Sequence, residues 1–298
     1  MSVIKSFSVG DGDMFYINHG SDNFTIIDCC IDDDTKGPIL REVSSLSSKK
    51  GITRFISTHP DDDHIGGLEF LDDKIGIVNF YCVKNDTTKP DQTDSFDRYC
   101  QLRDSEKKAF YISRGCNRRW MNQEDKERGS SGINILWPIL DNKAFKEALK
   151  AAATGKSPNN ISPVIKYSLN GSATALWMGD LETEFMEQIK GEIILPKVDI
   201  LFAPHHGRDT GKVPESMLKE MSPRLIVIGE APSKDLNYYK GYNTITQNSA
   251  GDIAFDCDDG KVHVFTSMDY DVEYLYDDEK KLSGFYYTGT LYLGEDDD

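Results

Sequence analysis

Short apolar runs separated by turn residues dominate the beginning of the chain. The sequences GDGD and GSDN between these runs are typical of turns, so the runs on either side predict strands. We expect these first strands at residues 2–9, 14–20 and 23–28. Between residues 37 and 49, apolar residues recur at helical spacing and predict a helix. The run RFIS, at residues 54–57, predicts one more strand.

The second half of the chain repeats this alternation of apolar strands and helical stretches. Further strands are expected at residues 75–83, 133–138, 164–169, 173–178, 197–203 and 224–229. One helix is expected within residues 179–191, starting at Asp180 and ending at Gly191. Another is expected at residues 213–221. Three closing strand segments are expected at 252–265, 272–276 and 284–293. Strands with few helices, then strands with helices, predict two packed sheets with helices outside, an α/β (αββα) sandwich in one domain spanning residues 1–298.

Residues 84–132 interrupt this pattern, because they are polar, charged and poor in strand signals. We interpret them as an insertion with one helix near residues 95–110. From Arg98 to Arg128 there are nine Lys or Arg and five Asp or Glu, a local charge of +4, although the whole chain carries −16. The segment is either a solvated face or a basic wall beside an active site. Its aromatic residues either stack on bases or form a small core: Tyr99, Phe110, Tyr111 and Trp120.

Composition narrows the class of protein. The 298 residues are 38% hydrophobic and 28% charged, which suits a soluble globular protein. No apolar run approaches the roughly 20 residues that span a bilayer, and the first residues do not resemble a secretory signal. The six Cys show no paired spacing, so we expect reduced thiols and a cytoplasmic location. The net charge of −16 argues against general adhesion to nucleic acid or anionic membranes.

The candidate chemistry begins in the stretch STHPDDDHIGG, which directly follows the strand predicted at residues 54–57. If this loop stays extended, alternation places His59, Asp61 and Asp63 on one side and His64 elsewhere, so that the loop serves two neighbouring ions. A helix start rich in Asp is the alternative, but it does not explain two His. The spacing therefore predicts a metal site.

Two other strand ends supply further ligands. Asp180 follows the apolar run ATALWM and is either a carboxylate that bridges two cations or a simple helix cap. The sequence PHHG follows the strand predicted at residues 197–203. Adjacent side chains point in different directions, so we expect one of His205 and His206 on the metal and the other toward the substrate, with an ordinary surface pair as the alternative.

Taken together, these motifs resemble those of metallo-β-lactamase-fold hydrolases. The likeness is to the branch that includes the soluble domain of ComEC-type DNA-uptake proteins, which carries HxDxDH. The segments VGDGD (9–13), TIID (25–28), GINILWP (132–138) and NIS (160–162) are also similar to that branch. The resemblance implies the metallo-β-lactamase fold and this set of metal ligands: His59, Asp61, Asp63, His64, Asp180 and His205. The chain departs from the family in lacking a His between residues 65 and 204, which weakens the first metal position.

The resemblance also implies a reaction. We expect two divalent ions, with Mn²⁺ favoured over Zn²⁺ because about half of the ligands are oxygen atoms. The expected activity is a phosphodiesterase or nuclease in which water attacks, with Asp63 and His206 as catalytic residues. We expect Asn160 and Ser162 to orient ligands or substrate, and a polyanionic substrate to contact the basic segment through Arg114, Arg118 and Arg119. The alternatives are hydrolysis of a small phosphoester, nucleotide or lactone-like molecule, or a degenerate metal-binding scaffold that recruits a protein partner.

Overall fold

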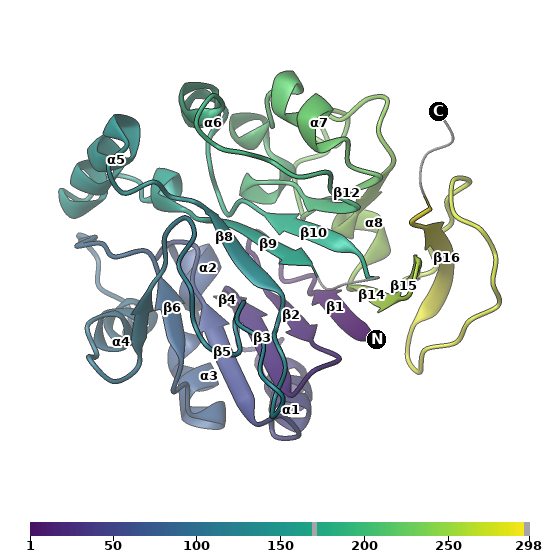
Figure 1. Cartoon of the computed structure of the whole chain (residues 1–298), viewed down its shortest axis with the longest axis horizontal. Coiled ribbons are helices and arrows are strands. Elements are labelled where there is room, and N and C mark those ends of the chain that lie inside the picture. The colour runs from purple at the N-terminus through teal and green to yellow at the C-terminus, as the bar shows by residue number, and fades with distance from the viewer. Residues whose placement is uncertain (169–171, 295–298) are drawn as a thin grey trace.

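Two β-sheets stack face to face, with helices on both outer faces, in the computed structural model, which describes residues 1–168 and 172–294 (Figure 1). Within these residues the first sheet has nine strands, in the order β16 (Tyr286–Tyr292), β15 (Lys261–Thr266), β14 (Ile253–Asp258), β1 (Ser2–Ser6), β2 (Phe15–Asn18), β3 (Asn23–Ile27), β5 (Ile52–Ile56), β6 (Phe80–Cys82) and β7 (Ala109–Tyr111). The second has six, in the order β13 (Thr244–Thr246), β12 (Leu225–Ile228), β11 (Ile200–Phe202), β10 (Thr174–Trp177), β9 (Val164–Ser168) and β8 (Ile133–Trp137).

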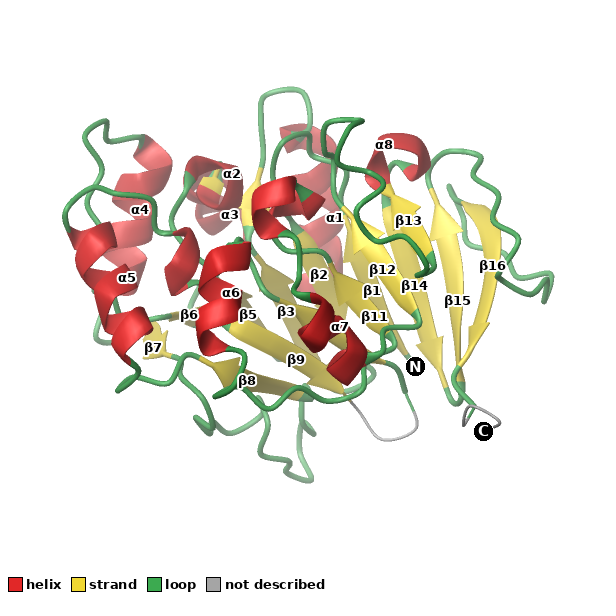
Figure 2. Cartoon of the chain, turned by 90° about the horizontal axis from the view of Figure 1, so that it is seen from above, coloured by secondary structure: helices red, strands yellow, loops and turns green. Residues whose placement is uncertain are grey.

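Helices complete the four layers. The first sheet is covered by α1 (Lys36–Ser47), α3 (Leu68–Ile75) and α4 (Asp94–Arg103). The second sheet is covered by α5 (Lys143–Ala153), α6 (Thr183–Ile189) and α7 (Glu215–Met221), which lie in front of it in Figure 2. The shorter elements are β4 (Cys29–Cys30), α2 (Asp62–Ile65), α8 (Gln247–Ala250) and 3₁₀ turns at Asn159–Ile161, His205–Gly207 and Asp209–Gly211. The αββα sandwich expected from the sequence is confirmed.

Strand β2 shows how one strand serves two cores. Its residues Phe15 and Ile17 lie in the cluster between the two sheets, whereas Tyr16, between them in sequence, lies in the cluster under the outer helices. This follows from the two-residue period of a strand, which sends successive side chains to opposite faces. Because both faces of β2 are buried, its sequence is a mostly apolar run and does not alternate between polar and apolar residues.

The directions of the strands decide where loops meet. Strands β3 and β5 are parallel in the first sheet, and β10 and β11 are parallel in the second. The carboxyl ends of parallel strands lie at one edge of a sheet, and ligands commonly bind in the crevice outside these ends. The motifs found in the sequence follow β5, β10 and β11.

The segment 84–132 is more closely joined to the fold than an insertion would be. Strand β7 pairs in parallel with β6 and extends the first sheet, and α4 packs Phe96, Tyr99 and Leu102 into the core beneath that sheet. Tyr99 is 1% exposed, so it is a core residue and does not stack on bases. The sequence missed this because parallel pairing joins segments that share no local turn signal.

Three local expectations are wrong or incomplete. The segment 272–276 is not a regular strand, because its single pairing is an isolated bridge between Tyr276 and Thr290. The helix expected from Asp180 begins at Thr183 and ends at Ile189. The strand expected at residues 164–169 ends at Ser168, and residue 169 lies outside the described part of the chain.

Two simple observations bear on the environment of the chain. Among the helices of residues 1–168 and 172–294, none is long and apolar enough to cross a membrane. The six Cys, all of which the structure describes, are free thiols.

Candidate metal centre

Five loops converge at the shared edge of the two sheets. The first sheet contributes the loop between β1 and β2 and the segments after β3 and β5. The second sheet contributes the segments after β10 and β11. In chain order, the acidic and imidazole side chains that these loops place at the edge are Asp13, Asp28, His59, Asp61, Asp63, His64, Asp180, His205 and His206.

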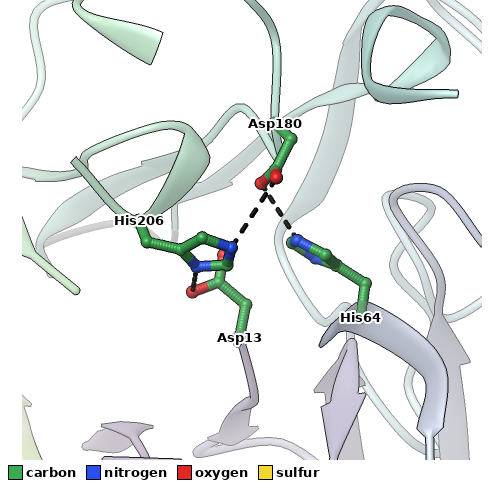
Figure 3. Close-up of side chains that lie close together, drawn as sticks. All are labelled: Asp13, His64, Asp180 and His206. Carbon is green, nitrogen blue, oxygen red and sulfur yellow. Dashed lines mark hydrogen bonds and ion pairs between the residues drawn. The ribbon is translucent and has the colours of Figure 1, made fainter. Parts of the chain in front are cut away.

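Asp180 lies at the centre of this group and is 2% exposed (Figure 3). Its Oδ1 is 3.0 Å from His64 Nε2, and its Oδ2 is 3.6 Å from the Nε2 of His206. The same Oδ2 lies 3.6 Å from His205 Nε2 and 4.0 Å from His59 Nε2. One carboxylate therefore faces the Nε2 atoms of four imidazoles, which is the placement expected of a ligand that can bind more than one ion.

Buried carboxylates hold two of these rings from behind. Asp28 Oδ2 lies 2.9 Å from His64 Nδ1, and Asp13 Oδ1 lies 3.1 Å from His206 Nδ1. Asp28 also accepts hydrogen bonds from the backbone N–H and the hydroxyl of Thr58. A carboxylate on the outer nitrogen fixes the orientation and tautomer of a metal-binding His. Asp13 and Asp28 were not among the site residues predicted from the sequence.

His59 is held by a hydroxyl. Its Nδ1 is 3.2 Å from Ser162 Oγ, and this oxygen also accepts a hydrogen bond from the backbone N–H of Asp180. Ser162 therefore joins a ring from the first sheet to the central carboxylate of the second. Asn160 does not reach the cluster, because its amide bonds to the side chain and the backbone N–H of Glu182 at the start of α6.

The inner atoms of the cluster face one another at ion-pair distances but form no well-aligned hydrogen bonds. Among the described residues, four buried atoms that point into it make no hydrogen bond: Nε2 of His59, His64 and His206, and Oδ1 of Asp180. Buried polar atoms nearly always form hydrogen bonds, so four buried nitrogen and oxygen atoms without a well-aligned one need an explanation. Imidazole nitrogens and carboxylate oxygens are ligands of divalent transition metals. The residues present therefore fit a divalent ion.

Two overlapping groups of residues, here called donor groups, place metal-ligand atoms close enough together to hold an ion. One consists of Asp13, His64, Asp180 and His206, and the other of His59, Asp63 and His64. Within each group the ligand atoms lie within 4.8 Å of one another. Asp61 and His205 belong to neither group, and Asp13 already faces the outer nitrogen of His206.

The carboxylates of the cluster need positive charge nearby to remain ionised while buried. Burial raises the pKa of Asp180, but His64, His206 and His59 outweigh it and hold that pKa well below its usual range. Burial lowers the pKa of His206, yet Asp13, Asp63 and Asp180 raise it to about 10. The carboxylates are thus balanced by protons on imidazoles, and a divalent ion would supply the same charge after displacing those protons.

The HHG turn separates the two adjacent rings. His205 and His206 have φ values of 54° and 57°, followed by 87° at Gly207, where a Cβ would lie only 2.6 Å from Ile228 Cγ2. This uncommon backbone directs His206 inward, where it is 1% exposed and 3.4 Å from Asp63. His205 stays half-buried, with Nδ1 2.8 Å from the Thr210 hydroxyl. The geometry favours the reverse of the sequence-based assignment, with His206 as a ligand and His205 toward the opening.

The loop after β5 is not extended as expected. Helix α2 begins at Asp62, with Asp61 as the residue before it, so side chains turn by about 100° per residue instead of alternating. Asp63 then faces His206, whereas Asp61 turns toward Lys89, whose Nζ is 3.3 Å from Asp61 Oδ1. The expected common side for Asp61 and Asp63 is therefore wrong.

The structure does not bring the three predicted arginines to this cluster. Arg118 packs 5.0 Å from the ring centroid of Tyr81 and bonds to Asn79, which precedes β6 at the edge opposite the metal centre. The other two have partners of their own: Arg114 bonds to the Glu192 carbonyl and Arg119 to the Asp125 carboxylate. These contacts correct the expectation of a basic wall beside the active site.

Comparison with known proteins identifies the fold. Residues 8–128 match the sequence pattern of the family described as the metallo-beta-lactamase superfamily. No curated protein sequence matches the chain significantly. A solved structure described as a new diphosphatase from the PhnP family aligns with 13% identity and a TM-score of 0.44, over 86% of this chain and 98% of that one. The family match and the two stacked sheets establish the metallo-β-lactamase fold.

Proposed function

We propose that this metallo-β-lactamase-fold chain is a metal-dependent phosphodiesterase in which water is the attacking group. One observation carries the proposal: three buried imidazoles direct their Nε2 atoms at the Asp180 carboxylate, with their outer nitrogens held by Asp13, Asp28 and Ser162. A divalent ion bound there lowers the pKa of water and neutralises charge on phosphoryl oxygens. We propose His59, His64, His206, Asp63 and Asp180 as its ligands.

The remaining residues have separate proposed roles. His205 is half-buried at the opening of the cluster, and its Nδ1 is held by Thr210. We assign His205 to protonate the leaving oxygen or to contact the phosphate, the role that the sequence suggested for His206. Burial raises the pKa of Asp63, but His206, His64 and His59 together lower it to about 2, so we propose this anionic carboxylate as a ligand.

The charge distribution favours a small phosphodiester over nucleic acid. The chain has a net charge of −16, and Arg118 lies at the opposite edge of the sheet. Near the cluster, Lys89 and Lys156 line a pocket of about 250 Å³ that Asp61 also borders. A pocket of this size accepts one small anionic molecule. Nucleic acid, suggested by the likeness to ComEC-type proteins, remains the alternative substrate.

The identity of the metal is part of the proposal. We propose Mn²⁺ over Zn²⁺, as the sequence suggested, but with Asp61 turned away the argument rests on the oxygen ligands Asp63 and Asp180 alone. The free state of all six Cys supports a reducing compartment, and we propose the cytoplasm.

The test uses purified chain stripped of metal and reloaded with Mn²⁺ or Zn²⁺. Hydrolysis is measured on bis(p-nitrophenyl) phosphate, p-nitrophenyl phosphate, a chromogenic lactone, plasmid DNA and RNA, each with and without excess EDTA. We expect the diester to be cleaved fastest, and only with metal. Full activity in EDTA contradicts a metal-dependent reaction, and preferred cleavage of the lactone contradicts a phosphodiesterase.

A matched pair of variants separates site chemistry from general damage. Asp63→Asn weakens a ligand and is expected to lower turnover by roughly 100-fold or more while the fold is retained. Asp141→Asn changes a carboxylate that is 97% exposed and belongs to neither donor group, and should leave turnover nearly unchanged. Metal binding without hydrolysis of any substrate would favour the degenerate-scaffold alternative.

A further inference from the structure

Asp61 has a partner that the metal-site motif does not anticipate. Its Oδ1 lies 3.3 Å from the ammonium of Lys89, and the same ammonium lies 3.3 Å from Asp62 Oδ1. The carboxylate is absent from both donor groups found in the described residues, and its distance to His59 Nε2 is 3.7 Å. Asp61 is therefore paired with a fixed cation of the chain itself.

Lys89 is held in place by its surroundings. Its side chain is only 14% exposed, and its ammonium lies 5.6 Å from the ring centroid of Phe96. The preceding residue, Thr88, donates its backbone N–H to the Ala152 carbonyl and its hydroxyl to the Ala153 carbonyl at the end of α5. A loop anchored in this way delivers the ammonium to Asp61, unlike an exposed lysine that is free to move.

The side of the centre near Asp61 is also short of neutral donors. The chain has six His, and two of them, His19 and His263, bond to Thr25 and Thr290 within the first sheet. The other four all face Asp180, and of these His59 is the one with an ion-pair contact to Asp61, at 3.7 Å. A second ion beside Asp61 would have to displace the Lys89 ammonium or tolerate its positive charge at short range.

We propose that the centre binds a single divalent ion and that Lys89 supplies the second positive charge. This rests on the proposed metal-dependent function and changes its expected stoichiometry from two ions to one. The ion is held by the overlapping donor groups that share His64, while Asp61 stays outside and positions Lys89. Lys89 also lines the pocket of about 250 Å³ and therefore borders the space that we propose for an anionic substrate.

The test counts ions directly. Metal-free protein is titrated with Mn²⁺, the bound ions are counted by native mass spectrometry, and electron paramagnetic resonance distinguishes an isolated Mn²⁺ from a coupled pair. We expect one ion in the wild type and in Lys89→Arg, which keeps the charge. Lys89→Met frees Asp61 and is expected to take up a second, coupled ion. Lys156→Met, on the exposed rim of the same pocket, is the control and stays at one.

A second variant covers the case in which Lys89→Met does not fold. Because Asp61 is placed outside the ligand shell, Asp61→Asn should change Mn²⁺ affinity less than the roughly 10–100-fold typical of a lost supporting contact. A larger loss overturns the inference, as do two ions in the wild type or one ion in a folded Lys89→Met. Binding of no ion at all overturns the proposed function instead, so the two failures are distinguishable.

Discussion

At the scale of single residues, the centre depends on side chains that do not face the ion position. Asp28 and Asp13 each bind the outer nitrogen of one imidazole, and both carboxylates are buried or nearly so. A buried carboxylate is costly unless it is paired, so each of these acids and its histidine stabilise one another. The rings of His64 and His206 are therefore fixed with their Nε2 atoms toward Asp180.

This support predicts a measurable loss of affinity. Asp13→Asn and Asp28→Asn should each weaken Mn²⁺ binding by roughly 10–100-fold, because the ring loses the partner that fixes its tautomer. Isothermal titration calorimetry measures the effect. Asp11→Asn is the control, since Asp11 lies in the same loop with a side chain that is 79% exposed and paired with Arg208. Equal affinities in all three variants would show that the carboxylates do not support the rings.

The same residues predict how metal binding depends on pH. In the metal-free centre, neighbouring carboxylates raise the pKa of His206 to about 10 and that of His64 well above its usual value, although burial opposes both shifts. Both rings are then protonated at pH 7 and must lose their protons to bind an ion. Affinity should therefore fall as the pH falls. Calorimetry at pH 7 in buffers of different ionisation enthalpy should detect release of about two protons per ion, and none if the rings are neutral.

At the scale of elements, the turn at His205–Gly207 is the least ordinary part of the edge. Three successive residues adopt positive φ, a conformation that costs a non-glycine residue of order 1–3 kcal/mol. Dense packing keeps the turn in place, since Gly229 also lies against His206, and a Cβ there would be 3.1 Å from His206 Cα. The strain is located where it separates two adjacent imidazoles.

Glycine substitutions test whether this packing matters. Gly207→Ala adds a methyl group 2.6 Å from Ile228 and should destabilise the fold by about 2–4 kcal/mol. Gly241→Ala is matched to it, because Gly241 has a φ of 89° against 87° at Gly207 but has nothing within 4 Å. It should cost only about 1–2 kcal/mol of backbone strain. Urea unfolding measures both, and equal losses would show that packing around the turn is unimportant.

An element can be predicted from the sequence when its own residues carry the pattern that forms it. The helix at Lys36–Ser47 and the strand at Leu225–Ile228 match their apolar patterns closely, because propensity and burial agree there. Strand β7 has no such signal, since it is three residues long and its partner β6 lies far back in the chain. The helix start at α2 was set aside in favour of an extended loop, because three consecutive Asp suit both conformations.

In the candidate site, too, residues in short motifs were predictable, and residues whose partners are distant in the sequence were not. The HxDxDH, GD and PHHG motifs include five residues that the structure brings into the two donor groups, since a metal site would concentrate unusual residue types in short stretches: His59, Asp63, His64, Asp180 and His206. Asp13 was passed over because its partner His206 is 193 residues away, and a single Asp in a turn has an ordinary local explanation. The roles of His205 and His206 depend on the backbone angles of the turn. Two adjacent residues of the same type do not reveal which side chain points inward.

At the scale of the whole molecule, the centre joins the two sheets. His59, Asp63 and His64 follow β5 in the first sheet, and Asp180 and His206 follow β10 and β11 in the second. An ion held by both sets binds the folded chain and not the separated segments. Its binding free energy is therefore added to the stability of the assembled sandwich.

This linkage predicts a rise in stability on metal binding. At a free Mn²⁺ concentration of 100 Kd, the free energy of unfolding should increase by about 2.7 kcal/mol. Thermal unfolding with increasing Mn²⁺ measures the shift against an EDTA reference. Asp180→Asn, which alters the carboxylate shared by the imidazoles, should abolish most of the rise. An equal rise in that variant would place the stabilising ion elsewhere.

The position of β1 has a consequence for the time course of synthesis. This strand is flanked by β2 and β14, with Ser2 opposite Cys257, so the middle of the first sheet is complete only when residues near 257 are available. On a ribosome, β1 emerges before β14 and cannot form this pairing until residues near 257 have been translated. His206 and Asp180 also arrive long after Asp13. The donor group that contains Asp13 and His206 therefore cannot be complete until 193 residues after Asp13 have been translated.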